Sequence, residues 1–167
     1  MRRRLLLATL APVLATASLA GCGFELKRPP ELRFRTIQLA GFAPRSPLAA
    51  ELARQVAFTP STRVVASLPE AEVVLQALTD DREKSVVATT SANQVREFEL
   101  RYRFRFRLVT QSGKELLPAS EILLKRELTY TESAALAKEQ EEAFLYRAMQ
   151  NDIVSQVLRR LASVRLV

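Results

Sequence analysis

The chain has 167 residues, with 25 Lys and Arg against 18 Asp and Glu, and a formal net charge of +7 at pH 7. It contains no histidine and a single cysteine. These absences exclude Ser-His-Asp and Cys-His catalytic arrangements and zinc sites built on these residues. The four glycines form no phosphate-binding loop, so the composition predicts a non-enzymatic protein that holds no metal or cofactor.

The N-terminus begins with three arginines after Met1 and has the pattern of an export signal. Its apolar stretch, residues 5–17, is interrupted by Thr and Pro and is shorter than the about 20 apolar residues of a membrane-spanning helix. Leu19-Ala20-Gly21-Cys22 resembles a bacterial lipobox, in which the peptide is cut before the cysteine and the sulfur receives a diacylglyceryl group. An ordinary secretory signal ending in Ser18-Leu19-Ala20 is the alternative. We predict removal of residues 1–21 and lipidation of Cys22.

Lipidation gives Cys22 a use in an oxidising compartment, where a free thiol is a liability. Two or more acyl chains hold a protein stably on a membrane, because each buried methylene contributes about 0.8 kcal/mol. Gly23 stands where an Asp would resemble an inner-membrane retention signal. The predicted location is therefore the periplasmic side of the outer membrane.

Cleavage would leave 146 residues (167 − 21) and 22 basic residues (25 − 3) against 18 acidic ones. The resulting net charge of +4 (22 − 18) does not indicate nucleic-acid binding; it fits an anionic lipid or an acidic protein surface. Residues 22–31 contain Pro29-Pro30 and are predicted to form a lipidated tether. Residues 32–167 are predicted to form one domain.

The first elements of that domain are a strand and a capped helix. Phe34 to Leu39 has strand-favouring residues. Ser46 can cap a helix whose first turn begins at Pro47 and which ends before Pro60. Residues 72–78 and 84–90 follow as extended segments, which form either one long bent strand or two short ones.

The clearest pattern is the alternation from Glu97 to Leu108, which predicts a strand with one buried face. Ser112-Gly113-Lys114 predicts a hairpin loop, and Ile122 to Tyr130 the returning strand. Apolar residues then repeat every four positions between Ala135 and Ala162, which predicts one long helix. The apolar face of the alternating strand comprises Phe98, Leu100, Tyr102, Phe104, Phe106 and Leu108.

Together these elements predict an α+β fold, a two-layer sandwich. Its small, mostly antiparallel or mixed sheet has four strands, with one short helix and one long C-terminal helix packed on one face.

The other face of the alternating strand carries a row of four arginines, Arg101, Arg103, Arg105 and Arg107. Charge repulsion within the row requires compensation. One interpretation is a solvated face balanced by carboxylates of the same or a neighbouring strand, which would also protect a sheet edge if this strand were outermost. The other is a face that docks a partner or binds an anion, because Arg holds phosphate in a bidentate manner.

Several segments together resemble the LptE family, the lipopolysaccharide-assembly lipoproteins of Gram-negative outer membranes. The resemblance covers nearly all of the predicted mature chain, in order and spacing. It is carried by Cys22-Gly23-Phe24-Glu25-Leu26, Asn93 to Leu100, Ala135-Leu136-Ala137-Lys138-Glu139 with the acidic run that follows, and Leu158-Arg159-Arg160-Leu161.

This resemblance implies a lipoprotein that plugs the outer-membrane β-barrel LptD, helps that barrel assemble and binds lipopolysaccharide for delivery to the outer leaflet. The family's ligand-linked lysine falls on Lys138. Its other basic position falls on Ser91, a departure from the family, with Arg96 as the nearest basic residue. We therefore take Lys138 and Arg96 as candidate lipopolysaccharide-binding residues.

Two other functions stay open from the residues alone. One is a lipoprotein accessory of a phospholipid ABC-transport system, which also combines a lipobox with a small α/β domain. The other is a periplasmic hydrolase built on carboxylates, for which the sequence offers Asp80-Asp81 and the acidic residues Glu139, Glu141 and Glu142.

Overall fold

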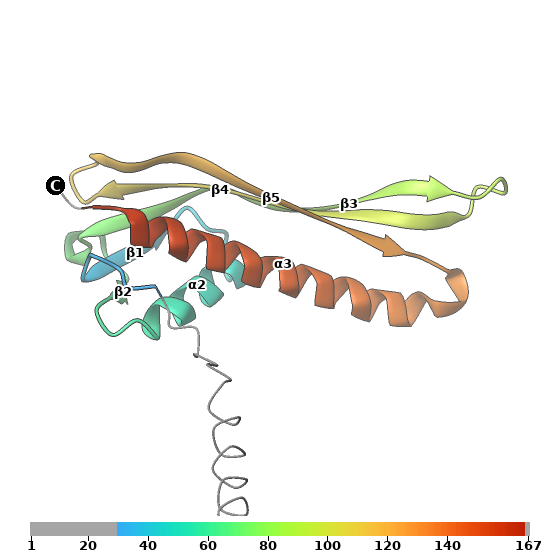
Figure 1. Cartoon of the computed structure of the whole chain (residues 1–167), viewed down its shortest axis with the longest axis horizontal. Coiled ribbons are helices and arrows are strands. Elements are labelled where there is room, and N and C mark those ends of the chain that lie inside the picture. The colour runs from blue at the N-terminus through green and yellow to red at the C-terminus, as the bar shows by residue number, and fades with distance from the viewer. Residues whose placement is uncertain (1–29, 166–167) are drawn as a thin grey trace, which may run out of the picture.

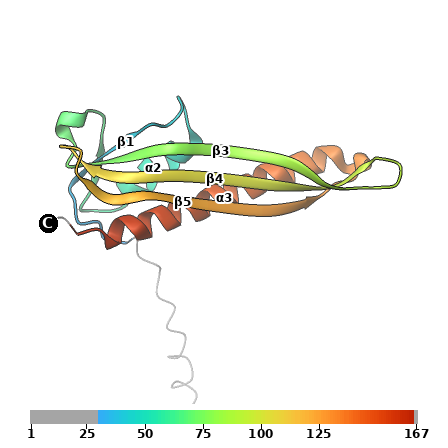
Figure 2. The same cartoon turned by 90° about the horizontal axis from the view of Figure 1, so that it is seen from above.

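The computed structural model describes residues 30–165, so the predicted signal, Cys22 and most of the tether lie outside the described residues. Within this range, helices α2 and α3 lie side by side under one face of a sheet (Figure 1), and the other face is uncovered (Figure 2). The elements are, in chain order, β1 (Thr36–Ala40), α2 (Pro47–Ala57), β2 (Arg63–Val65), the short 3-10 helix η2 (Leu68–Glu70), β3 (Val73–Thr89), β4 (Val95–Thr110), β5 (Glu115–Thr129), the 3-10 helix η3 (Glu132–Ala134) and α3 (Ala135–Ser163).

The sheet is mixed, with strand order β2-β1-β3-β4-β5. β1 runs parallel to β2 and β3, whereas β3, β4 and β5 form an antiparallel meander. The predicted two-layer α+β sandwich, with one short and one long C-terminal helix on one face, is confirmed. The predicted strand number is wrong, because the described sheet has five strands.

The additional strand is β2, which is only three residues long. A segment of that length is too short to show the two-residue alternation by which strands are recognised in a sequence. Its pairing with β1, with Thr36 opposite Arg63, depends on a neighbour far away in the chain.

The two extended segments left open by the sequence are one strand, β3, which runs through the charged residues between them. An irregularity between Ala77 and Thr79 shifts its register against β4. β5 begins at Glu115, earlier than the predicted start at Ile122. β4 lies between β3 and β5, so the arginine row does not protect a sheet edge.

The hydrophobic core lies between the sheet and the two helices. Tyr102, Phe104 and Phe106 of β4 are all buried, as the alternation predicted. They pack with buried residues on one face of α3, including Met149 and Ile153. No helix within residues 30–165 is both long and apolar enough to cross a membrane.

Helix α2 begins as predicted. The Ser46 hydroxyl oxygen accepts a hydrogen bond from the backbone N–H of Ala49 at 3.2 Å, and Pro47 occupies the first turn, where its missing N–H costs nothing. Helix α3 runs along the length of the sheet (Figure 1), and its N-terminal end lies near the end of β5. This places the start of α3 beside the start of β4.

Candidate functional site at the end of the β4–β5 ladder

Arg96 and Lys138 lie at the same end of the sheet, although 42 residues (138 − 96) separate them in sequence. The carbonyl oxygen of Arg96 accepts a hydrogen bond from the backbone N–H of Tyr130 at 2.7 Å. The ammonium of Lys138 donates to the hydroxyl of Thr129 at 3.1 Å, and Thr129 pairs with Glu97 across the ladder. The fold therefore brings both predicted ligand-binding residues to one region.

The ammonium of Lys138 already has a carboxylate partner. It lies 2.8 Å from the Glu141 carboxylate, one turn further along α3, and the Lys138 side chain is only 19% exposed. An anion that bound here would compete with Glu141. This carboxylate reduces the positive potential that Lys138 offers.

Arg96 lines a shallow pocket of about 680 Å³ between the beginning of β4 and the turn that follows β5. Tyr130 and the polar side chains of Thr131, Glu132 and Ser133 complete this pocket. Ser91, the position aligned with the family's basic residue, lies in the β3–β4 turn and is exposed. Arg96 is thus the basic side chain of this pocket.

The arginine row lies on the sheet face away from the helices and divides into paired and exposed members. Arg101 forms ion pairs with Glu99 and, at 3.9 Å, with Glu83. The hydrogen bond from Arg101 holds the pKa of the Glu99 carboxyl below its usual value, and Lys125 of β5 also lies 3.5 Å from this carboxylate. This end of the row matches the balanced-face interpretation.

The other members differ. Arg107 donates to the Gln76 side-chain oxygen at 2.7 Å. Arg103 and Arg105 are exposed, and neither forms an ion pair with any residue between positions 30 and 165. Arg105 stands opposite Glu121 in the ladder. The middle of the row is therefore available to an anionic or polar partner.

The structure also shows a polar group that the sequence pattern did not predict, because Asp80 stood between the two predicted extended segments. The Asp80 carboxylate accepts hydrogen bonds from the Tyr102 hydroxyl at 3.0 Å and the Ser46 hydroxyl at 2.8 Å. Arg82 donates to the Gln150 side chain at 2.8 Å, and its guanidinium lies 4.7 Å from the centre of the Tyr102 ring. Asp80 and Arg82 are two residues apart in one strand, so both side chains point to the same face of the sheet, the face covered by the helices. This spacing was visible in the sequence.

This polar group joins the N-terminus of α2 and the middle of α3 to the sheet. Gln150 also donates to the carbonyl oxygen of Pro47 at 3.1 Å. Burial raises the pKa of the Tyr102 phenol to about 12. The hydrogen bonds hold the two helices in register with β3 and β4, so we assign this group a structural role. Among residues 30–165, no three His, Cys, Asp or Glu side chains gather in a way suited to a metal ion.

Residues 34–161 match the LptE family, described as lipopolysaccharide-assembly. The chain belongs to the LptE family. LptE proteins are non-enzymatic outer-membrane lipoproteins of lipopolysaccharide assembly. As a member of this family, the chain is a lipopolysaccharide-assembly protein. The match favours this function over the phospholipid-transport and hydrolase alternatives. No curated protein matches the chain.

Solved structures of lipoproteins have the same fold as this LptE chain. The solution structure of lipoprotein B from Nitrosomonas europaea is 33% identical, with 84% of this chain and 91% of that chain covered and a TM-score of 0.72. Rare lipoprotein B from Shewanella oneidensis is 23% identical, covers 77% and 95%, and has a TM-score of 0.64. A minor lipoprotein from Acinetobacter baumannii, 16% identical over 81% and 99% with a TM-score of 0.63, is similar in fold.

Proposed function

We propose that this LptE protein is anchored through Cys22 to the periplasmic side of the outer membrane, plugs an LptD-type β-barrel and assists its assembly. We further propose that it binds lipopolysaccharide for delivery to the outer leaflet. The family match over residues 34–161 is the observation that carries this proposal. The surface of the fold supports it in two ways.

The first support is the polarity of the uncovered sheet face. On β4 that face presents Arg103 and Arg105 to solvent, beside Asp81 of β3 and Glu121 of β5; Leu123 of β5 is exposed on the same face. The lumen of a large outer-membrane barrel is polar and wet. A plug whose uncovered sheet face is mainly polar fits such a lumen.

The second support is the position of Arg96 and Lys138 at one end of the sheet. Lipid A carries phosphates, and fixed Arg and Lys groups form charge-assisted hydrogen bonds with phosphate oxygens. Such groups could replace the divalent cations that hold lipopolysaccharide aggregates together. Lys138 can turn toward a phosphate by exchanging its bonds to Thr129 and Glu141, because both partners are themselves at the surface.

Purification from solubilised outer membranes tests the plug. Affinity-tagged protein extracted in mild detergent should bring down a large β-barrel in a stoichiometric complex. A clean monomer under conditions that preserve other outer-membrane complexes would contradict the proposal. The same sample tests the anchor, because mass spectrometry should find the acylated N-terminus at Cys22 and lose it in a Cys22→Ala variant.

A charge-reversal pair tests the ligand site. We expect Lys138→Glu combined with Arg96→Glu to weaken lipopolysaccharide binding while circular dichroism and thermal unfolding stay unchanged. The matched control is Arg103→Glu with Arg105→Glu, which makes the same change of charge on the uncovered sheet face. Unchanged binding in the first pair would exclude these two residues as the site, and loss only in the second pair would assign the site to the uncovered sheet face at the middle of β4.

A further inference from the structure

The first described residues of the chain are held against the loop that precedes β2. The Ser61 hydroxyl donates to the carbonyl oxygen of Leu32 at 3.3 Å, and the Thr62 hydroxyl donates to the carbonyl oxygen of Phe34 at 2.6 Å. The side chains of Leu32 and Phe34 are both buried. The point at which the chain joins the domain is therefore fixed in position.

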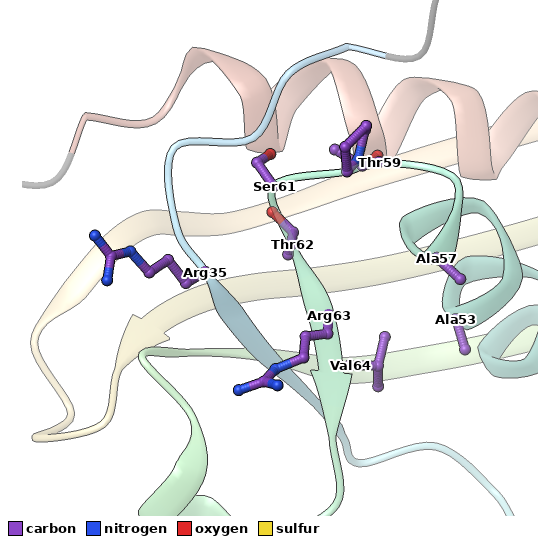
Figure 3. Close-up of a pocket in the computed structure, with 9 residues that line it drawn as sticks. Arg35, Ala53, Ala57, Thr59, Ser61, Thr62, Arg63 and Val64 are labelled. Atoms are coloured by element: carbon purple, nitrogen blue, oxygen red, sulfur yellow. The ribbon is translucent and has the colours of Figure 1, made fainter.

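Beside this junction lies a pocket of about 830 Å³ with two arginines in its wall, Arg35 and Arg63. In Figure 3 both guanidinium groups extend to the same side, away from Ala53 and Ala57 of α2. Small and hydroxyl-bearing residues form the rest of the wall, including Thr59, Ser61 and Thr62. The hydroxyls of Ser61 and Thr62 already donate to backbone carbonyl oxygens. The two guanidinium groups are therefore the donors that this pocket offers to a phosphate.

The charged groups of Arg35 and Arg63 differ from that of Arg101, which is paired with carboxylates. Neither guanidinium takes part in an ion pair with another residue of the described range 30–165. The nearest carboxylate contact is made by the backbone, because the N–H of Arg35 donates to Glu72 at 2.7 Å. The positive charge of the guanidinium groups is therefore available to an external anion.

Charge is distributed unevenly along the long axis of the molecule. Helix α3 carries Glu139, Glu141 and Glu142 in its first half, whereas its last two turns carry Arg159 and Arg160 and no acid. The C-terminal end of α3 lies at the same end of the molecule as β1 (Figure 1). The end of the molecule that contains Arg35 and Arg63 therefore also holds the basic end of α3, which favours contact with an anionic surface.

The position of Cys22 identifies that surface. Cys22 precedes Pro30 by eight residues (30 − 22), and eight residues reach at most about 28 Å when fully extended. We propose that the Arg35–Arg63 pocket binds the phosphate of anionic phospholipid headgroups in the leaflet that holds the anchor. This proposal rests on the proposed lipid anchor. The contact would orient the domain on the membrane, which a lipid anchor alone does not do.

Vesicle binding of a chain that lacks the anchor tests the pocket. The mature chain with Cys22→Ala should float with vesicles that contain roughly 30% phosphatidylglycerol and not with pure phosphatidylcholine, and added salt should release it. Arg35→Gln with Arg63→Gln should weaken this binding roughly 30-fold, about fivefold for each arginine near an anionic surface. Thermal unfolding should be unchanged, because both side chains are exposed.

The matched control is Arg103→Gln with Arg105→Gln, which removes the same charge from the middle of β4 and should lose less than half of the vesicle binding. Equal losses in both pairs would overturn the proposal, because binding would then depend on net charge alone. Equal binding to phosphatidylcholine vesicles would also overturn it. Saturation of the pocket by inorganic phosphate, without any binding to phosphatidylglycerol, would reassign it to a soluble anion.

Failure of this test is distinguishable from failure of the proposed function. Barrel co-purification and acylation of Cys22 are measured on the natural lipidated protein, whereas vesicle flotation uses the chain without the anchor. The natural protein could be acylated and bound to its barrel while its Cys22→Ala form does not bind anionic vesicles. That result would refute only the headgroup site.

Discussion

Replacing Phe104 by Ala tests the assignment of the two faces of β4. The Phe104 side chain is 0% exposed and stacks on two other rings. Its ring centroid lies 5.8 Å from that of Phe42 and 5.2 Å from that of Phe106. Truncation would remove this ring and leave a cavity beside the rings of Phe42 and Phe106.

The expected cost is about 3 to 5 kcal/mol, the range for a buried Phe replaced by Ala. Lost aromatic stacking places Phe104 in the upper part of that range. At about 4 °C per kcal/mol for a domain of this size, the midpoint of thermal unfolding should fall by roughly 12 to 20 °C. Urea unfolding followed by far-ultraviolet circular dichroism measures the free energy directly.

Phe144→Ala is the matched control, because the Phe144 side chain is 63% exposed on α3 and its loss should change stability by less than about 0.5 kcal/mol. A loss below about 1 kcal/mol for Phe104→Ala would refute the reasoning. It would mean that the aromatic face of β4 is turned to solvent and the arginine face to the helices.

Three further predictions concern other parts of the fold. Gly41→Ala should destabilise the fold by at least about 2 kcal/mol in urea unfolding, because φ is +79° and the added Cβ would clash with the carbonyl oxygen of Ala77. Gly113→Ala also has a positive φ, +88°, but the added Cβ would meet open space, so it should cost less. Because the pKa of Tyr102 is raised to about 12, the contribution of its neutral phenol to the free energy of unfolding is fully present below pH 10 and is lost as the pH rises toward about 12. Tyr102→Phe should therefore show a smaller fall in stability across that interval, and phenolate absorbance is the second readout. Glu141→Gln should strengthen lipopolysaccharide binding, because it removes the carboxylate that competes for Lys138; weaker binding would show that Glu141 positions this lysine for the ligand.

The elements with local signals were predictable from the sequence. The alternation in β4 shows which side chains are buried, because a strand turns successive residues to opposite faces whatever lies next to it. The Ser46 cap and the Pro47 start mark α2 through bonds within one turn. The apolar repeat of α3 likewise reports its buried face, and the structure places its end within one residue of the prediction.

The arrangement of strands was not predictable in the same way. β2 has three residues and owes its existence to pairing with β1. The position of β4 inside the sheet removes the edge-protection role of the arginine row, and nothing in β4 itself specifies its neighbours. The charged residues within β3 looked like a break, since their partners Ser46, Tyr102 and Gln150 lie on other elements.

The candidate sites divide along the same line. The lipidation of Cys22 and the arginine row were predicted from the chain itself, because a lipobox and an arginine row are contiguous patterns. The fold was needed to show that Arg96 lies at the same end of the sheet as Lys138, that Glu141 pairs with this lysine, and that Arg35 and Arg63 share a pocket. Phosphate recognition requires charges that converge in space, and convergence depends on strand pairing and helix packing between segments far apart in the chain.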